Sequence, residues 1–247
     1  MQPISLILLV HQEAGIIERA VADFHKKVIS KIPGSEFIVS EDGSTDGTKD
    51  ILLRIKEQYY LTLHMGDKRK GYTVAFKEAL ALATKDIIFF SDSDGQHDPN
   101  DFWKMYDLIG DYDMVIGWKK TRHDGLARLY LSKAFNAIIS FGFSVPLHDS
   151  NCGFRLMKKE VVDFLLSENW HLRHCIGAEL AIRAHRRGFR VTEVEVSHET
   201  RRFGTSRSLP VKKLPLIIVH ILSGLFKLKR DNKKSLTHTD GNGRFWV

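Results

Sequence analysis

The chain has 247 residues, of which 43% are hydrophobic and 27% charged, a balance typical of one folded domain with a full core. Its 37 Lys and Arg against 30 Asp and Glu give a net charge of +7, which suits an anionic partner such as a phosphate ester, a nucleic acid or an acidic lipid surface. The two cysteines, Cys152 and Cys175, exclude a disulfide scaffold or a repeated metal-ligand pattern and favour a reducing, cytosolic setting. The apolar run 4–10 lacks a basic flank and a cleavage site, so we expect a first strand there and no signal peptide.

Short apolar or β-branched runs alternate with stretches of helical period along the first half of the chain. The runs are 5–10, 36–40, 61–64, 86–91 and 114–117. This alternation predicts an α/β fold, a single Rossmann-like domain with a mostly parallel central sheet flanked by helices. Ligands bind such sheets outside the carboxyl ends of the strands, so the loops 11–13, 41–44 and 92–94 are the first candidates for a site.

Two later segments have the apolar pattern of helices. Residues 126–143 predict a helix that we expect to lie across the mouth of the site. The apolar segment 214–228 is bracketed by Lys and Arg and is shorter than the roughly 20 residues that span a bilayer. It predicts an interfacial helix, and a helix packed on the core remains open. The chain is therefore divided into a main domain (1–210), an amphipathic helix joined to it (211–230) and a polar, flexible tail (231–247).

Asp92 and Asp94 follow the apolar run 87–90 and deliver two carboxylates to one loop. Oxygen ligands of this kind suit a hard cation, Mg²⁺ or Mn²⁺, that bridges a diphosphate, and Gln96 can add an amide oxygen. Because Asp, Ser and Gly also favour solvated turns, the pair alone is weak support for a metal site. The loop is bounded by Asp98-Pro99, which predicts a helix start because Asp98 can cap it and proline suits its first position.

Two further loops carry charged side chains. The acidic run 41–48 follows a strand and places carboxylates where a base or ribose donates hydrogen bonds, and a turn capped by Asp46 is a compatible interpretation. The basic run 68–71 precedes a predicted helix, where cations and free amides can approach phosphate. We assign Lys70 of this run to nucleotide binding, with a solvated run of charge as the competing interpretation.

Five motifs stand in order along the chain: E-D-G-S-T-D-G-T, K-G-Y-T-V-A-F, D-S-D-G-Q-H-D-P, D-S-N-C-G-F-R and R-R-F-G-T-S-R. From the first strand to about Arg207 this order resembles family-2 glycosyltransferases of the GT-A fold, and among them the polyprenyl-phosphate (dolichyl-phosphate) mannose and glucose synthases. The resemblance implies a GT-A domain that moves a hexose from a nucleotide sugar of the GDP-mannose or UDP-glucose type to a polyprenyl phosphate, with Mg²⁺ or Mn²⁺ as cofactor.

The resemblance also implies roles for single residues. By resemblance, Glu13 and Asp42 would contact the nucleoside. With Asp92 and with Lys70, which is assigned above from its place before a helix, they make up the predicted nucleotide site. The resemblance implies that Asp92, Asp94 and Gln96 bind the metal. It also implies that Lys119, Arg128 and Ser132 bind the acceptor phosphate. We place Asp94, Asp149, Arg201 and Arg207 in the catalytic set; by resemblance, the two arginines lie in a loop that closes over the diphosphate, and the role of Asp149 is left open below.

Two departures from the family pattern concern specificity. His11-Gln12-Glu13 stands where the family usually has a Pro-Tyr-Asn-Glu turn. Lys119 stands where an arginine is commoner, and lysine keeps the charge but loses the two-pronged grip on phosphate. The nucleobase and the acceptor are therefore less well defined by the resemblance than the reaction type.

The expected reaction is a single displacement that inverts the anomeric carbon, while a metal neutralises charge on the departing nucleoside diphosphate. A lipid phosphate is already an anionic nucleophile, whereas a hydroxyl acceptor needs a base. Relatives that act on hydroxyls tend to carry an acidic pair where this chain keeps only Glu179, which we expect to be structural and paired with an arginine of its helix. Asp149 is the base if the acceptor is a hydroxyl, and otherwise orients the acceptor or the closing loop.

Other functions remain in competition. One is a glycosyltransferase that extends a saccharide at a hydroxyl, with Asp149 or Glu179 as base. Another is a non-catalytic nucleotide-sugar binding protein. The presence of Asp92, Asp94 and Arg201 argues against this alternative. Nucleic acid is not an expected partner, because no reading helix or stacking module is present. We expect peripheral attachment to the cytoplasmic face of a membrane. A homo-oligomer is left open. Among the histidines we single out His97, because it adjoins the metal motif.

Overall fold

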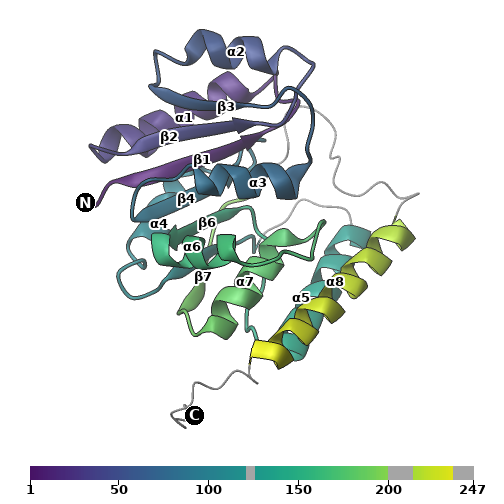
Figure 1. Ribbon diagram of the computed structural model, residues 1–247. Helices are drawn as coiled ribbons and strands as arrows, with labels where there is room; N and C mark the ends of the chain where they lie inside the picture. Colours follow the sequence, from purple (N-terminus) through teal and green to yellow (C-terminus); the bar gives the residue numbers. More distant parts are fainter. Residues whose placement is uncertain (121–125, 200–213, 236–247) are drawn as a thin grey trace.

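The computed structural model describes residues 1–120, 126–199 and 214–235 (Figure 1). These residues form a seven-stranded sheet in the order β3-β2-β1-β4-β6-β5-β7. The strands are β1 (Ile4–Val10), β2 (Glu36–Glu41), β3 (Leu61–Met65), β4 (Ile87–Asp92), β5 (Met114–Trp118), β6 (Phe154–Lys158) and β7 (Val191–Glu195). The predicted α/β fold with a mostly parallel sheet is confirmed, and a strand occupies each of the five predicted positions.

Strand β6 runs against the direction of its neighbours. It pairs antiparallel with β4 on one side and with β5 on the other, whereas β3, β2, β1 and β4 pair in parallel, as do β5 and β7. Because of this reversal, the first residue of β6 lies beside the end of β4, with Phe154 opposite Ser91. The loop that precedes β6 therefore reaches the same edge of the sheet as Asp92.

Helices cover both faces of the sheet. They are α1 (Ile17–Lys27), α2 (Thr48–Ile55), α3 (Tyr72–Ala81), α4 (Phe102–Tyr106), α5 (Leu126–Phe143), α6 (Lys159–Ser167), α7 (Ile176–Arg187) and α8 (Leu214–Ser235), with short 3-10 turns η1 (Ile29–Lys31) and η2 (Pro99–Asp101). Neighbouring strand residues point to opposite faces, and β4 shows the result. The Phe89 ring packs against Phe24 of α1 and Phe102 of α4, while Phe90 packs against Phe76 of α3.

The predicted start of a helix at Asp98-Pro99 is confirmed. The Asp98 carboxylate accepts a hydrogen bond from the Asn100 amide at 3.0 Å, and Pro99 is the first residue of η2. The predicted helix over 126–143 is also confirmed, as α5. Among the described residues, no helix has both the length and the apolarity that crossing a bilayer requires.

Helix α8 runs beside α5 at the side of the domain (Figure 1). Ile217, Leu225 and Leu228 are buried, whereas Val219 and Phe226 are 60% and 64% exposed. The helix therefore has both a packed face and an apolar face open to solvent.

Helix α8 continues to Ser235, past the boundary at residue 230 that the sequence predicts. The Asp231 carboxylate accounts for part of this extension, because it accepts a hydrogen bond from His171 at 2.6 Å and lies 3.6 Å from the Arg183 guanidinium. Residues 231–235 are thus helical, where the sequence predicted the beginning of a flexible tail.

Candidate active site

A cavity of about 1060 Å³ opens at the carboxyl edge of the sheet. One end is lined by the loops that follow the strands, including Glu13, Asp42, Asp92, Asp94, Gln96, Lys119 and Asp149. The other end is lined by apolar residues of α5 and α8, including Leu131, Phe135, Ile138, Ile217, Ile221 and Leu225. Residues predicted to bind nucleotide, metal and acceptor phosphate thus lie on the wall of one space.

Asp92 and Asp94 come together at the polar end. Burial and the neighbouring Asp94 charge raise the pKa of the Asp92 carboxyl to about 7. The Tyr72 hydroxyl donates to Asp92 Oδ1 at 3.0 Å, and the backbone amide of Gln96 donates to Asp94 Oδ1 at 3.2 Å. A divalent cation would relieve the repulsion between the two carboxylates, so the pair fits the proposed Mg²⁺ or Mn²⁺.

Among the described residues, Asp92 and Asp94 are not part of a larger cluster of metal-binding side chains. Within the described ranges, no group of three or more His, Cys, Asp or Glu side chains is arranged to hold a metal ion. Two carboxylates and Gln96 leave positions for water and for phosphate oxygens of a substrate, which is how Mg²⁺ is commonly bound at phosphate sites.

The loop before β6 closes tightly on Asp92. The Asp92 amide donates to the Gly153 carbonyl at 3.1 Å. A Cβ at position 153 would lie 2.0 Å from Asp92 Oδ2, a distance at which something must move. Glycine is therefore required there for Asp92 to keep its position. This contact was not foreseen from the sequence, although Gly153 stands within one of its motifs.

Lys119 and Asp149 face each other on the cavity wall. Their charged atoms are 3.6 Å apart, and the two side chains are only 14% and 7% exposed. Lys119 follows β5 and Asp149 precedes β6, so the antiparallel pairing of these strands brings them together. Lys119, predicted to bind the acceptor, and Asp149, predicted to be catalytic, thus lie next to each other on the cavity wall.

Asp42 organises the first acidic motif and the basic run together. Its two carboxylate oxygens accept hydrogen bonds from the backbone amides of Lys70 at 2.6 Å and Gly71 at 2.9 Å. The Lys70 ammonium turns to Glu78, 2.7 Å away, and it is Arg69 that lines the cavity. The nucleotide-binding role of Lys70 stays a prediction. In this geometry its backbone amide contacts the site residue Asp42, whereas its ammonium group pairs with Glu78.

The loop 11–14 is fastened to the turn that precedes α2. The amides of Gln12 and Glu13 donate to the hydroxyls of Ser44 and Thr48 at 2.8 and 3.0 Å. The N-cap residue of α2 is Gly47 and not Asp46, but the Asp46 carboxylate accepts from the Thr48 amide at 3.1 Å and so holds the turn in front of the helix. Glu13 is thereby held on the cavity wall, in the place from which a nucleoside contact is predicted.

Gln96 and Glu199 form a reciprocal pair. The Glu199 amide donates to the Gln96 carbonyl at 2.8 Å, and the Gln96 side-chain nitrogen donates to the Glu199 carbonyl at 3.1 Å. The predicted metal loop is thus joined to the residues that lead into the R-R-F-G-T-S-R motif. Arg201 and Arg207 lie outside the described residues, as does the side chain of Arg128; Ser132 lines the cavity.

Arg155, which was not among the predicted site residues, is almost fully buried in the cavity wall. Its guanidinium donates to the carbonyls of Cys152 and Gly177, both at 2.9 Å, and of Ser150 at 3.2 Å. These bonds fix the loop before β6 to the first turn of α7. The signal available in the sequence was an arginine between the apolar residues Phe154 and Leu156.

Glu179 is structural, as expected. It is fully buried in α7, accepts from the Arg183 guanidinium at 2.8 Å, and accepts from the backbone amides of His171 and Leu172 at 2.7 and 2.6 Å. His97 lies on the cavity wall and stacks on Phe154 with ring centroids 4.9 Å apart. Burial and the Lys119 charge hold the pKa of His97 well below its ordinary value, so the ring is neutral.

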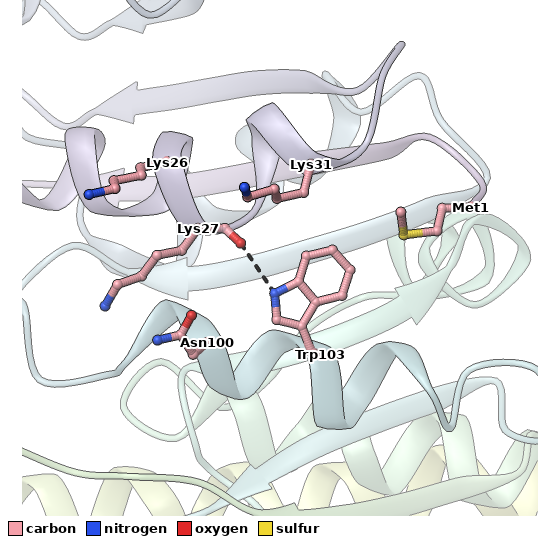
Figure 2. Close-up of a pocket in the computed structure, with 6 residues that line it drawn as sticks. All are labelled: Met1, Lys26, Lys27, Lys31, Asn100 and Trp103. Atoms are coloured by element: carbon pink, nitrogen blue, oxygen red, sulfur yellow. Dashed lines mark hydrogen bonds between the residues drawn. The ribbon is translucent and has the colours of Figure 1, made fainter.

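A second hollow, of about 510 Å³, lies between α1 and the turn that leads into α4 (Figure 2). The Trp103 indole donates to the Lys27 carbonyl at 3.2 Å, and the Lys27 ammonium contacts Asp98 at 2.9 Å. Lys26 and Lys31 complete its charged rim. These contacts attach α1 to α4 and to the start of η2, and the hollow includes none of the predicted site residues.

Residues 5–166 match the family described as Glycosyl transferase family 2. The chain belongs to this family, its fold is the GT-A fold, and it is a glycosyltransferase.

Three curated relatives are similar in sequence. The chain is 28% identical over 188 residues to the polyprenol monophosphomannose synthase of Mycolicibacterium smegmatis, covering 71% of each protein. It is 25% identical over 202 residues to a dolichyl-phosphate hexose transferase of Haloferax volcanii, covering 80% of this chain and 83% of the relative. Glycosyltransferase AglD of the same organism is 28% identical over 205 residues, which are 79% of this chain but 33% of AglD. The chain thus spans about a third of that relative.

Solved structures agree on the fold. Glucosyl-3-phosphoglycerate synthase of Mycobacterium tuberculosis, in complex with Mn²⁺, UDP and phosphoglyceric acid, superposes with a TM-score of 0.69 at 17% identity. The match covers 92% of this chain and 78% of the synthase.

Proposed function

We propose that this glycosyltransferase moves a hexose, with inversion, from a nucleotide sugar to a polyprenyl phosphate. The observation that carries the proposal is the two-ended cavity. Its charged end holds the candidate donor residues, and its other end is an apolar groove between α5 and α8. A phosphate attached to a long isoprenoid needs both kinds of lining in one site, whereas a sugar acceptor does not need the apolar end.

The acceptor phosphate is assigned to the junction of the two ends. Lys119 and Ser132 line the cavity there, and Asp149 lies 3.6 Å from the Lys119 ammonium. In this assignment Lys119 attracts the phosphate and Asp149 orients the lysine. No base is required, because a phosphate oxygen is already an anionic nucleophile. Arg128, by resemblance, adds a second cation.

The donor is assigned to the strand-end loops, with Glu13 and Asp42 at the nucleoside and Asp92, Asp94 and Gln96 at a bound Mg²⁺ or Mn²⁺. When bound, the metal supplies positive charge to the leaving diphosphate. Asp92 and Asp94 hold it in place, and Arg201 and Arg207 are proposed to add charge from the closing loop. The proposed donor is a nucleotide sugar of the GDP-mannose or UDP-glucose type.

Peripheral attachment to the cytoplasmic face of a membrane completes the proposal. It is supported by the open apolar face of α8 and by the exposed Tyr130 and Phe141 of α5. Lys227, Lys229 and Arg230 on α8 add positive charge that suits anionic headgroups.

A second candidate is transfer to a saccharide hydroxyl, with Asp149 as base. The favouring observation is that Asp149 is a buried carboxylate on the cavity wall. Glu179, the other base considered, has its carboxylate oxygens engaged by Arg183 and two backbone amides and does not line the cavity.

The test measures nucleoside diphosphate release from GDP-mannose and UDP-glucose with Mn²⁺ or Mg²⁺. A short polyprenyl phosphate, the matching polyprenyl alcohol and a free oligosaccharide are compared as acceptors. We expect release that requires the polyprenyl phosphate and stops when EDTA removes the metal. Release with the oligosaccharide would support the second candidate, and the absence of turnover with any acceptor would favour a non-catalytic binder.

A further inference from the structure

The two ends of the proposed donor site stand on strands that are not neighbours. Asp42 follows β2 and Asp92 ends β4, and β1 lies between these strands. Two interstrand spacings separate them by about 10 Å, too far for a direct hydrogen bond. Something other than the sheet pairing must therefore orient the two carboxylates toward a common ligand.

The segment Lys70–Tyr72 spans this gap. Asp42 accepts from the consecutive amides of Lys70 and Gly71 at 2.6 and 2.9 Å, and the next residue, Tyr72, donates its hydroxyl to Asp92 Oδ1 at 3.0 Å. Gly71 has a φ of +96°, a conformation that glycine adopts without strain, and α3 begins directly after it. Three consecutive residues thus contact both acidic groups.

The Tyr72 ring is held independently of its hydroxyl. It packs on Phe76 with centroids 6.0 Å apart, and Phe76 packs on Phe90 of β4 at 4.2 Å. On its other side, the Asp92 carboxylate lies against Gly153. The carboxylate is therefore confined between a hydroxyl donor and a glycine, and loss of the hydroxyl alone would free one of its oxygens.

We propose that Tyr72 is a positioning residue for the metal site, and that Lys70–Tyr72 is the connector that aligns Asp92 with Asp42. The inference rests on the proposed metal-binding role of Asp92. A hydrogen bond to a ligating carboxylate fixes its orientation, and removal of such a partner typically weakens metal binding by about 10-fold or more. Tyr72 acts through Asp92 and contacts no reacting atom in this proposal.

The test compares Tyr72→Phe with the unchanged protein in a titration with Mn²⁺ alone, in which the electron paramagnetic resonance signal reports free Mn²⁺. We expect the dissociation constant to rise about 10-fold. In turnover, the metal concentration for half-maximal rate should rise by a similar factor, while the rate at saturating metal changes little. A purely structural role would lower stability without moving the metal affinity.

Tyr106→Phe is the matched control. The Tyr106 hydroxyl bonds to the backbone of Gln2 at 2.6 and 3.1 Å, at the amino end of β1, and is not part of the cavity wall. Equal Mn²⁺ affinity in Tyr72→Phe and the unchanged protein would overturn the positioning role and leave the proposed function standing. Failure of the unchanged protein to bind Mn²⁺ would overturn the metal assignment itself, and the role of Tyr72 with it.

Discussion

At the scale of single residues, the site depends on close approaches that leave no room for a side-chain atom. Gly43 shows this as clearly as Gly153: it has a φ of +65°, and a Cβ there would lie 2.3 Å from the backbone of Lys68 and Arg69. The first acidic motif and the basic run are therefore packed backbone to backbone. Glycines in these motifs are explained by contact distances as well as by turns.

Gly153→Ala should reduce turnover about 100-fold, because the added Cβ must displace the Asp92 carboxylate, and a misplacement of about 1 Å costs a factor of this order. The measurement is the initial rate of nucleoside diphosphate release, with circular dichroism to verify folding. Gly110→Ala, where a Cβ would meet nothing within 4 Å, should be fully active. Full activity of Gly153→Ala would contradict the position given to Asp92.

At the scale of helices and strands, the parallel half of the sheet could be predicted and the reversed strand could not. The runs that became β1 to β5 are short and apolar and alternate with helices, which is the pattern of βαβ units. Strand β6 contains Arg155 and Lys158, whose charges hide its apolar character. Strand β7 is only partly buried and lacks an apolar run.

The same limit applies to the site. The Asp92–Asp94 pair and the turn held by Asp46 follow from local sequence, since neighbouring residues make these arrangements. The contacts of Gly153 with Asp92 and of Tyr72 with Asp92 join segments far apart in the chain. The first depends on the reversal of β6, which no local pattern indicates. The start of α3 after the basic run was predicted, but the strand end that the Tyr72 hydroxyl reaches was not.

Asp113 joins the three strands β5, β6 and β7 at one end. Its carboxylate accepts from the Lys158 ammonium at 2.8 Å, from the Arg190 amide at 2.9 Å and from the Arg190 guanidinium at 3.1 Å. These donors hold the pKa of Asp113 well below its ordinary value. Asp113→Ala should lower the free energy of unfolding at pH 7 by about 1–2 kcal/mol, a value reduced because the Arg190 side chain is largely exposed.

The stabilisation by Asp113 requires its ionised form, which the folded state favours. It is therefore fully present above the pKa of the unfolded carboxyl, near 4, and declines as the pH falls toward the lower folded pKa. Urea unfolding at pH 7 and pH 3 should show a smaller difference between the two proteins at pH 3. Asp107→Ala, on an exposed residue, should change stability little at either pH. An undiminished difference at pH 3 would contradict the ionic explanation.

At the scale of the whole molecule, the open apolar face of α8 predicts reversible membrane attachment. Val219 and Phe226 are seven residues apart, are 60% and 64% exposed, and do not line the cavity. Changing both to Asp should reduce flotation with anionic liposomes about 10-fold or more, because two apolar contacts with the lipid are lost. Leu53→Asp, on the exposed face of α2, should float like the unchanged protein. Equal flotation of all three would exclude α8 as the attachment face.

The reversed strand also bears on the order in which the protein can fold. Strands β3, β2, β1 and β4 pair with one another using only the first 92 residues, so their contacts can form early during synthesis. Strand β6 must then enter between β4 and β5, and such distant pairings form slowly because the intervening chain has to be ordered first. Asp92 and Asp94 are therefore expected to exist in a nascent chain well before Gly153 and Asp149 reach them, and catalytic competence should appear only in the last stage of folding.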